Sequence, residues 1–190
     1  KNSFCLFYPL NAVSQFILSQ IVSLSIKEEL DQWTEGISIK WPNDIYWNEK
    51  KICGILIEND LSGHHIGRSI SGIGVNINQE TFRSDAPNPV SLKQITGQEH
   101  ERYLILANIM RRLKEYYILL QTDSSGNAAN CIAERYARSL FRREGFHRYA
   151  DADGEFLARL LCVEPDGRFI LEDQAGKVRG YLFKEVQYIL

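Results

Sequence analysis

The chain has 190 residues, of which 44% are hydrophobic and 24% charged, and its formal net charge is -2. This composition is typical of a soluble globular protein with one ordinary domain, or one domain and a small appendage, and it argues against disorder. The near-neutral charge excludes a global nucleic-acid or membrane footprint, and no apolar run is long enough to cross a bilayer.

The first half of the chain predicts a helix followed by antiparallel strands. Apolar residues recur at helical spacing over 15–33, and Gly36 is expected to end that helix. Alternation over 37–41 predicts a short strand that ends at Pro42. Further strands are expected at 45–47, at 51–59 and, after a turn at 60–64, at 66–78.

The second half predicts helices and then a change of period. After a Pro/Asn/Asp loop at 82–89, helices are expected at 91–95, 99–121 and 128–141, with 142–149 ending the last one. Short strands follow at 155–163, 168–172, 177–183 and 185–189. Turns about every 8–12 residues indicate a small β-barrel or sandwich. The expected fold class is α+β, with a mixed, largely antiparallel sheet and helices in residues 1–150 and a small β domain in residues 151–190.

Cysteine and histidine usage predicts neither a disulfide framework nor a metal centre. The four cysteines are far apart and form no CxxC pair: Cys5, Cys53, Cys131 and Cys162. We expect reduced thiols that act as small buried hydrophobes, as in a cytoplasmic protein. No cysteine or carboxylate accompanies His64-His65 at ligand spacing, so no metal-binding residue is expected.

The run Lys40-Trp41-Pro42-Asn43-Asp44 places polar side chains at the end of a strand. Pro42 removes a ladder donor and stops the strand. Asn43 offers donors and acceptors and ionised Asp44 accepts, so together they could hold a ribose, a phosphate-bound metal or an amine. The simpler alternative is a turn in which both side chains bond their own backbone.

Two further segments could complete a ligand site. Lys51 enters an apolar strand, where a partly desolvated ammonium suits an anionic oxygen, and Gly54 lets a ligand approach the backbone. Gly72 and Gly74 could lie flat against a planar ligand, with Asn76 at the end of their strand. An exposed edge lysine, a bulge and tight sheet packing are the plain alternatives.

In combination these segments resemble the biotin protein ligase family in residue type, order and spacing. The resemblance extends through Ser91-Leu92 and the long helices to Gly154 and the C-terminal strands, so it covers most of the chain. It implies a ligase core like that of class II aminoacyl-tRNA synthetases, followed by an SH3-like barrel. The matched runs are Lys40 to Asp44, Lys51-x-x-Gly54-Ile55-Leu56-x-Glu58 and Gly72-x-Gly74-Val75-Asn76.

The resemblance also implies an activity and a role for each matched residue. Biotin and Mg-ATP would form biotinyl-5′-AMP, and biotin would then pass to a lysine of a biotin carboxyl carrier protein. The substrates and cofactors implied are biotin, ATP and Mg²⁺. Lys51 and Asp44 would be catalytic, one stabilising negative charge and the other receiving the incoming amine's proton. The expected binding residues are Lys51, Gly54, Gly72 and Gly74 for biotin, and Lys40, Asn43 and Asn76 for the adenylate.

The chain departs from the family upstream of these motifs. A Gly/Arg-rich loop of the GRGRxGR type and an earlier Ser-Thr pair do not occur, so the core is expected to lack its N-terminal part. Either the sequence is a piece of a longer protein or it is a truncated relative. No winged helix occurs, so no nucleic-acid partner or repressor function is expected. Sheet edges could pair two subunits into a homodimer. The alternative functions are a lipoate ligase or octanoyltransferase, and a non-catalytic relative without the adenylate loop.

Overall fold

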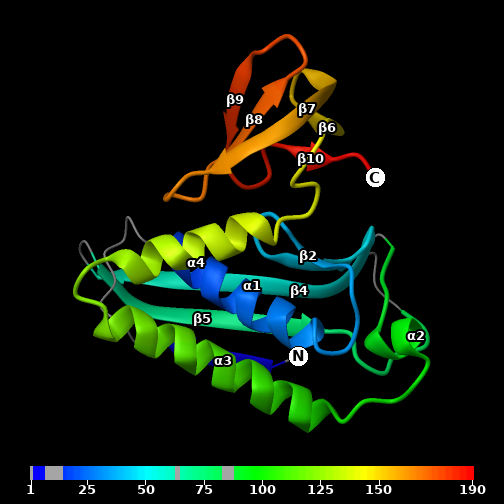
Figure 1. The fold of residues 1–190 in the computed structure, drawn as a ribbon, viewed down its shortest axis with the longest axis vertical. Helices are drawn as coiled ribbons and strands as arrows, with labels where there is room; N and C mark the ends of the chain where they lie inside the picture. The colour runs from blue at the N-terminus through cyan, green and yellow to red at the C-terminus, as the bar shows by residue number, and fades with distance from the viewer. Residues whose placement is uncertain (1, 7–14, 63–64, 83–87) are drawn as a thin grey trace.

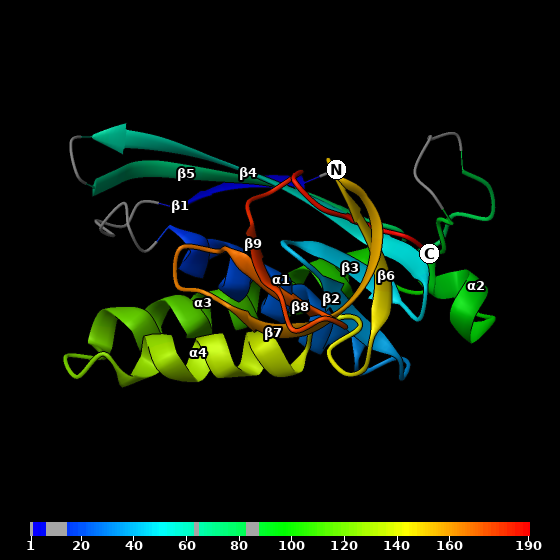
Figure 2. The same ribbon diagram turned by 90° about the horizontal axis from the view of Figure 1, so that it is seen from above.

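The computed structural model describes residues 2–6, 15–62, 65–82 and 88–190, and it has an α+β architecture. One five-stranded antiparallel sheet forms a core with three helices on one face, and a second five-stranded sheet lies at one end of that core (Figures 1 and 2). The expected α+β class with largely antiparallel strands is therefore confirmed.

The core sheet has the strand order β1-β5-β4-β3-β2, with every neighbour antiparallel. Local sequence alternation explains the short strand β2, since Ile37 and Ile39 are buried and Ser38 and Lys40 are half-exposed. The expectation that this strand ends at Pro42 is confirmed, since β2 does not extend past Lys40. The strands are β1 (Asn2–Leu6), β2 (Ile37–Lys40), β3 (Asp44–Trp47), β4 (Lys50–Ser62) and β5 (His65–Val75).

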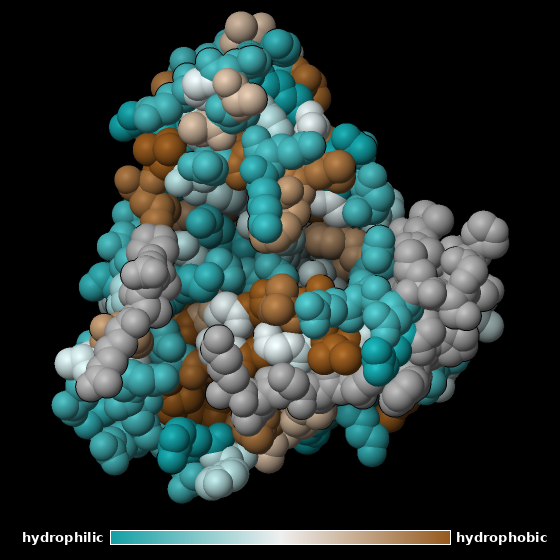
Figure 3. All heavy atoms as spheres, turned by 180° about the vertical axis from the view of Figure 1, so that it is seen from behind, coloured by the Kyte–Doolittle hydropathy of each residue, from teal (hydrophilic) through white to brown (hydrophobic). Residues whose placement is uncertain are grey.

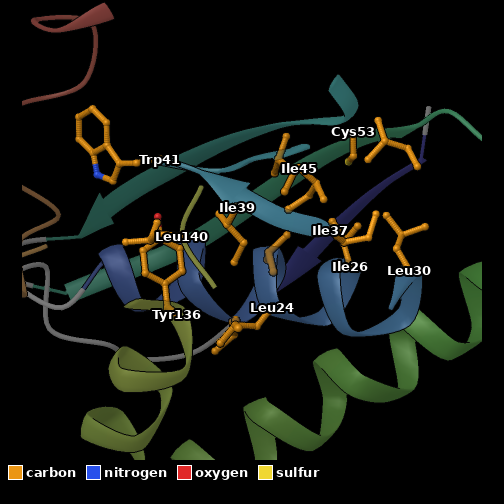
Figure 4. Packing of buried hydrophobic residues seen from close by; sticks show 14 of the residues in the cluster. Leu24, Ile26, Leu30, Ile37, Ile39, Trp41, Ile45, Cys53, Tyr136 and Leu140 are labelled. Atoms are coloured by element: carbon orange, nitrogen blue, oxygen red, sulfur yellow. The ribbon is translucent and has the colours of Figure 1, made fainter. Parts of the chain in front are cut away.

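Helix α1 (Phe16–Leu30) lies between this sheet and two outer helices, α3 (Arg102–Thr122) and α4 (Asn127–Arg138). That position explains why α1 is apolar around most of its circumference. Figure 4 shows Ile37 and Ile39 on the side of β2 that faces α1, with Ile37 near Ile26, and all three are buried. The outer helices bury one stripe each and leave their other faces exposed.

The short helix expected at 91–95 is confirmed as α2 (Leu92–Thr96). Ser91 begins it with a capping box, in which the hydroxyl accepts from the Gln94 amide and the Gln94 side chain accepts from the Ser91 amide. The segment before α2 also joins the core sheet, because Val90 donates to the carbonyl of Lys51 at 3.0 Å. The loop is thereby tied to the start of β4.

The C-terminal sheet has the order β10-β6-β7-β8-β9. Its first strand begins at His147, before the boundary expected at 150/151. The expectation that 142–149 ends the preceding helix is wrong, because α4 ends at Arg138 and 147–149 pair with β7. The strands are β6 (His147–Asp151), β7 (Gly154–Val163), β8 (Phe169–Asp173), β9 (Val178–Tyr181) and β10 (Gln187–Tyr188).

Trp41 joins the two sheets. Its ring stacks on Phe169 of β8 with centroids 4.9 Å apart, and its indole Nε1 donates to the carbonyl of Gly167 at 2.9 Å. Gly167 has a φ of +92°, and a Cβ there would lie 2.7 Å from a ring carbon of Phe16. The C-terminal sheet therefore packs against both the polar turn and the start of α1 through closely fitted contacts.

Two other expectations fail. Gly36 does not end α1, which stops at Leu30 with Asp31 as its cap; Gly36 instead takes a φ of +81° in the turn before β2. Of the three cysteines whose side chains are described, all are free, but only Cys53 is buried, whereas Cys131 and Cys162 are exposed. In the described ranges, no helix combines the length and hydrophobicity that crossing a membrane requires.

Candidate active site

The turn after β2 is fixed by bonds to distant elements. The carbonyl of Pro42 accepts from the buried hydroxyl of Tyr136 on α4 at 2.6 Å. The side-chain amide Nδ2 of Asn43 donates to the backbone carbonyl of Ile55 on β4 at 3.2 Å. Asp44 begins β3 and bonds Lys51 on β4. The described side-chain bonds of Asn43 and Asp44 thus go to another strand, not to their own backbone.

Lys51 and Asp44 form an ion pair, with Nζ 2.6 Å from Oδ2. Their side chains are 25% and 28% exposed, so the pair is partly desolvated and open to a ligand. The register shifts between Ile45 and Tyr46: Ile45 pairs with Cys53, whereas Tyr46 pairs with Lys51. This bulge brings Lys51 beside Gly54, where a Cβ would lie 3.2 Å from Lys51 Cε and 3.7 Å from Asp44 Oδ1.

The three expected wall glycines lie together on paired strands. Gly54 of β4 pairs with Gly74 of β5, and Leu56 pairs with Gly72. Leu56 is 64% exposed, so these positions belong to the sheet face opposite the helices. On that face, behind the helices of Figure 1, apolar residues gather below the C-terminal sheet (Figure 3). The three glycines leave their own positions on this face without side chains, next to the ion pair and bordered by Leu56, which suits a flat apolar group.

Lys40 lines the same cavity as Asp44 and Lys51. Its Nζ donates to the hydroxyl of Tyr46 at 3.2 Å and lies 5.0 Å from the ring centroids of both Tyr46 and Tyr188. Burial lowers the pKa of Lys40; the positive charges of Lys51 and Arg142 lower it further, and Asp44 opposes them. This ammonium is held between aromatic rings rather than by a carboxylate.

A cavity of about 460 Å³ lies between the core and the C-terminal sheet. Its core wall contains Lys40, Trp41, Pro42, Asn43, Asp44, Lys51 and Ile55. Its other wall is the segment around β10, with Phe183, Lys184, Val186, Gln187 and Tyr188. Sequence analysis missed this second wall, because no local motif distinguishes these residues and only long-range packing brings them to the site.

Asn76 lies outside the lining of this cavity. Its side-chain amide donates to the carbonyl of Val90 at 3.2 Å, and its backbone amide donates to Ile52 at 2.9 Å. In this arrangement Asn76 fastens the segment before α2 to β4. Its role toward an adenylate stays a prediction.

The described residues include no group of three or more His, Cys, Asp or Glu side chains that could hold a metal ion. Asp44 is the single carboxylate on the cavity wall, where three lysines accompany it. The side chains of His64 and His65 fall outside the part of the chain whose side chains are described. The arrangement suits an anionic ligand that brings its own metal ion, since Mg²⁺ commonly uses one or two carboxylates together with substrate phosphates.

Comparison with known proteins gives a consistent result. Residues 3–76 match the model of the biotin/lipoate A/B protein ligase family. The bifunctional ligase/repressor BirA of Bacillus spizizenii is 30% identical over 148 residues, which are 75% of this chain and 44% of that protein. The biotin--[acetyl-CoA-carboxylase] ligase of Paracoccus denitrificans is 31% identical over 153 residues, 74% of this chain and 59% of that protein. The chain thus spans about half the length of these curated relatives.

A solved structure supports the same fold. The biotin protein ligase of Aquifex aeolicus, in complex with biotin and ATP, matches with a TM-score of 0.73 and 23% sequence identity. The match covers 100% of this chain and 80% of that one. At this identity the likeness shows a shared fold, which includes both sheets described above.

Proposed function

We propose that this chain is a member of the biotin/lipoate A/B protein ligase family, and that it activates biotin with ATP and transfers it to a lysine of a biotin carboxyl carrier protein; the family model over residues 3–76 and the curated relatives support this. The observation that carries the proposal is the Lys51–Asp44 pair, 2.6 Å apart beside a glycine floor and a lysine-lined cavity. The pair supplies a cation and a carboxylate, which the two half-reactions need at one place.

In the first half-reaction, a carboxylate oxygen of biotin attacks the α-phosphorus of ATP, and the bond to the β-phosphate oxygen breaks to release pyrophosphate. Lys51 stabilises the negative charge that builds on the carboxylate and α-phosphate oxygens. Asn43 orients the nucleotide from the same turn, and Lys40 attracts its phosphates. Mg²⁺ held by the phosphates and Asp44 would spread their charge.

In the second half-reaction, the carrier lysine attacks the acyl carbon, the bond between that carbon and the phosphate oxygen breaks, and AMP leaves. The attacking ammonium must first lose a proton, which the Asp44 carboxylate accepts. Asp44 becomes available when Lys51 turns its ammonium toward the phosphate oxygens. The ion pair is thus the resting arrangement of both groups.

The remaining expected residues complete the substrate site. Gly54, Gly72 and Gly74 form the wall for the fused rings of biotin, and the half-buried Asn76 holds the adenylate from the end of β5. Register supports the glycine wall, because Gly54 and Gly74 are direct partners.

Lipoate ligation or octanoyl transfer is the competing function, because the matching family model covers biotin and lipoate ligases together. The run Lys40 to Asp44 and the C-terminal sheet favour biotin. Thermal shift with ATP plus biotin, compared with ATP plus lipoate, separates the two: a larger stabilisation by lipoate would overturn the biotin assignment.

Several finer features are part of the proposal. The core is related to class II aminoacyl-tRNA synthetases, and the C-terminal domain, which begins with β6 at His147, is an SH3-like barrel; the succession of short antiparallel strands supports this. The protein works in the cytoplasm, in keeping with its free described cysteines. The edge strand β1 offers a surface for a homodimer.

Calorimetry and a transfer assay test the function. Biotin is titrated into the chain alone and then with Mg-ATP, pyrophosphate release is followed, and a carrier domain is added as acceptor. We expect ordered binding, pyrophosphate release and a labelled carrier. Binding of biotin without pyrophosphate release would instead support the non-catalytic relative.

A further inference from the structure

Helix α4 is joined to the edge of the core sheet at the strand that leads into the active site. The amide of Ile39 donates to the carbonyl of Ser139, and the amide of Phe141 donates to the carbonyl of Ile39, both at 2.8 Å. Leu140 forms a parallel bridge with Ile39 between these two bonds. The segment that follows α4 is thereby fixed along the outer edge of β2, whose other edge pairs with β3.

Tyr136, in the last turn of α4, extends this contact past the end of β2. Lys40 and Asp44 form the last pair of the β2–β3 ladder, so the carbonyl of Pro42 lies in the turn beyond it. The hydroxyl of Tyr136 donates to this carbonyl at 2.6 Å. Tyr136 is fully buried, and burial raises its pKa well above the usual range, so the hydroxyl stays a donor at neutral and moderately alkaline pH.

This hydrogen bond fixes the peptide group that leads into the polar turn. A peptide group is planar, so a bond to the carbonyl of Pro42 also fixes the direction of the Asn43 backbone amide. The side chain of Asn43 is held by its bond to Ile55, and Asp44 follows directly. Tyr136 itself is not part of the cavity lining, so its link to the active site runs through the backbone of this turn.

We propose that Tyr136 is a positioning residue for biotin transfer, which holds the turn so that the Asp44 carboxylate meets the incoming ammonium of the carrier lysine and takes its proton. The use of Asp44 as the base rests on the proposed function, whereas the fixing of the turn rests on these contacts. Catalysis is sensitive to such placement, since a shift of about 1 Å in a reacting group can cost about 100-fold in rate.

Two tyrosines of the outer helices form a matched pair for the test. Tyr116 of α3 is also buried, and its hydroxyl also donates at 2.6 Å, but to the carboxylate of Glu28 on α1. Tyr136→Phe removes a bond to the turn, and Tyr116→Phe removes a bond between two helices. Because Tyr116 bonds a charged acceptor, its variant should lose at least as much stability. Tyr136→Phe keeps the ring that packs edge-on against Phe16, with centroids 5.5 Å apart, so it should fold.

The rate of biotin transfer from added biotinyl-AMP to a carrier domain, catalysed by the intact chain, tests the proposal. At about pH 7 we expect Tyr136→Phe to lower kcat about tenfold, with the KM for the carrier within about twofold. Tyr116→Phe should keep both constants within about twofold.

The pH profile distinguishes a displaced base from general damage. About 0.04% of ordinary lysine side chains are unprotonated at about pH 7, and about a tenth at about pH 9.5. An attacking amine that has already lost its proton needs no base. The deficit of Tyr136→Phe should therefore shrink from about tenfold to about threefold at the higher pH.

The charged and titratable groups around Asp44 are the same in the unaltered chain and both variants. Lys51 lies 2.6 Å from it, and Lys40, Tyr46 and the buried Cys53 also interact with its charge. Titration of these groups changes all three rates together. The ratio between the proteins therefore reports on the incoming amine.

Three results would overturn the proposal: an unaltered kcat in Tyr136→Phe, a loss of equal size in Tyr116→Phe, or a deficit as large at about pH 9.5 as at about pH 7. If Tyr136→Phe does not fold, Phe16→Leu takes its place, because it loosens the ring of Tyr136 and keeps the hydroxyl. That variant should show a smaller loss of kcat that alkaline pH also relieves, and an unaltered kcat would then count against the role of Tyr136.

Backbone amide signals separate this proposal from the proposed function. In a heteronuclear NMR spectrum, the amide signals of Asn43 and Asp44 should shift in Tyr136→Phe and stay in place in Tyr116→Phe, whether or not the chain is active. A chain that shows these shifts but transfers no biotin retains the fixing of the turn by Tyr136 and loses the proposed function. A chain that transfers biotin equally fast with and without this hydroxyl retains the function and loses the role of Tyr136.

Discussion

Nζ of Lys51 lies 2.6 Å from Oδ2 of Asp44, across neighbouring strands β3 and β4. Because each side chain is about a quarter exposed, the pair contributes little to stability, on the order of 1 kcal/mol or less. The pair instead keeps the Lys51 cation and the Asp44 carboxylate in one place, where a bound substrate can separate them.

Replacing Lys51 tests its catalytic role. Lys51→Ala should lower the rate of biotinyl-AMP formation about 100-fold or more, because the charge on the reacting oxygens loses its cation. The free energy of unfolding should change by about 1 kcal/mol or less. The adjacent exposed Lys50 is the control, and Lys50→Ala should keep its rate within about twofold. Unchanged pyrophosphate release in the Lys51 variant would refute the assignment.

Gly54→Ala should impair catalysis more than folding. The added Cβ would lie 3.2 Å from Lys51 Cε and 3.4 Å from Nζ, so the flexible lysine must shift. We expect a fall in kcat of about tenfold with a stability change of about 1 kcal/mol.

Gly180→Ala is the comparison for this variant, because its Cβ would lie 3.0 Å from a side-chain carbon of Arg168 and 3.1 Å from one of Ile170, outside the site. It should lose at least as much stability in urea unfolding and keep its kcat. Equal loss of kcat in the Gly54 and Gly180 variants would mean that general strain, not displaced Lys51, is responsible.

The affinity for ATP should fall at alkaline pH because of Lys40. Its pKa lies below the ordinary 10.5, so its ammonium loses the proton at a lower pH than an exposed lysine does. Affinity that depends on this cation is present at neutral pH and is lost as pH rises toward 10.5. Tyr46, with its pKa raised to about 12 by burial and by Asp44, stays protonated over this range.

Titrations of ATP at several pH values check this prediction, with Lys40→Arg as the comparison. Arginine stays charged, so the variant should show a smaller alkaline loss of affinity even if its geometry weakens binding at neutral pH. The same alkaline loss in both proteins would place the titrating group elsewhere.

Gly167→Ala should destabilise the contact between the two sheets. Its φ is +92°, and the new Cβ would lie 2.7 Å from Phe16, while the carbonyl must keep its bond to Trp41. Gly176→Ala shares the backbone strain, with a φ of +80°, but meets no atom within 4 Å. Urea unfolding should therefore show a further loss of about 1–3 kcal/mol in the Gly167 variant. Equal losses in both variants would show that the close packing on Phe16 relaxes without cost.

Sequence reasoning could predict features that depend on local pattern. Strand β2 ends before Pro42 because proline cannot donate to the ladder, and α2 begins at Ser91 because a capping box is a local arrangement. Lys51 and Asp44 lie on neighbouring strands that a single hairpin connects, so their proximity also depends on local pattern.

Other features of the fold and the site depend on long-range packing, which the local sequence pattern does not show. Regular alternation would place Lys51 and Gly54 on opposite faces, and the bulge that brings them together has no local signal. Cys131 and Cys162 have apolar neighbours yet lie on exposed faces, because burial depends on the opposing element. Tyr188 and Lys184 reach the cavity only through the docking of the second sheet.

The two walls of the cavity come from segments far apart in the sequence, Lys40 to Asp44 and Phe183 to Tyr188. A ribosome makes the first wall before helices α2 to α4, and the second only after these helices and most of the C-terminal sheet. Until then a nascent chain carries only half of the cavity. A ligand that needs both walls binds only after residue 188 has left the exit tunnel and the two sheets have docked.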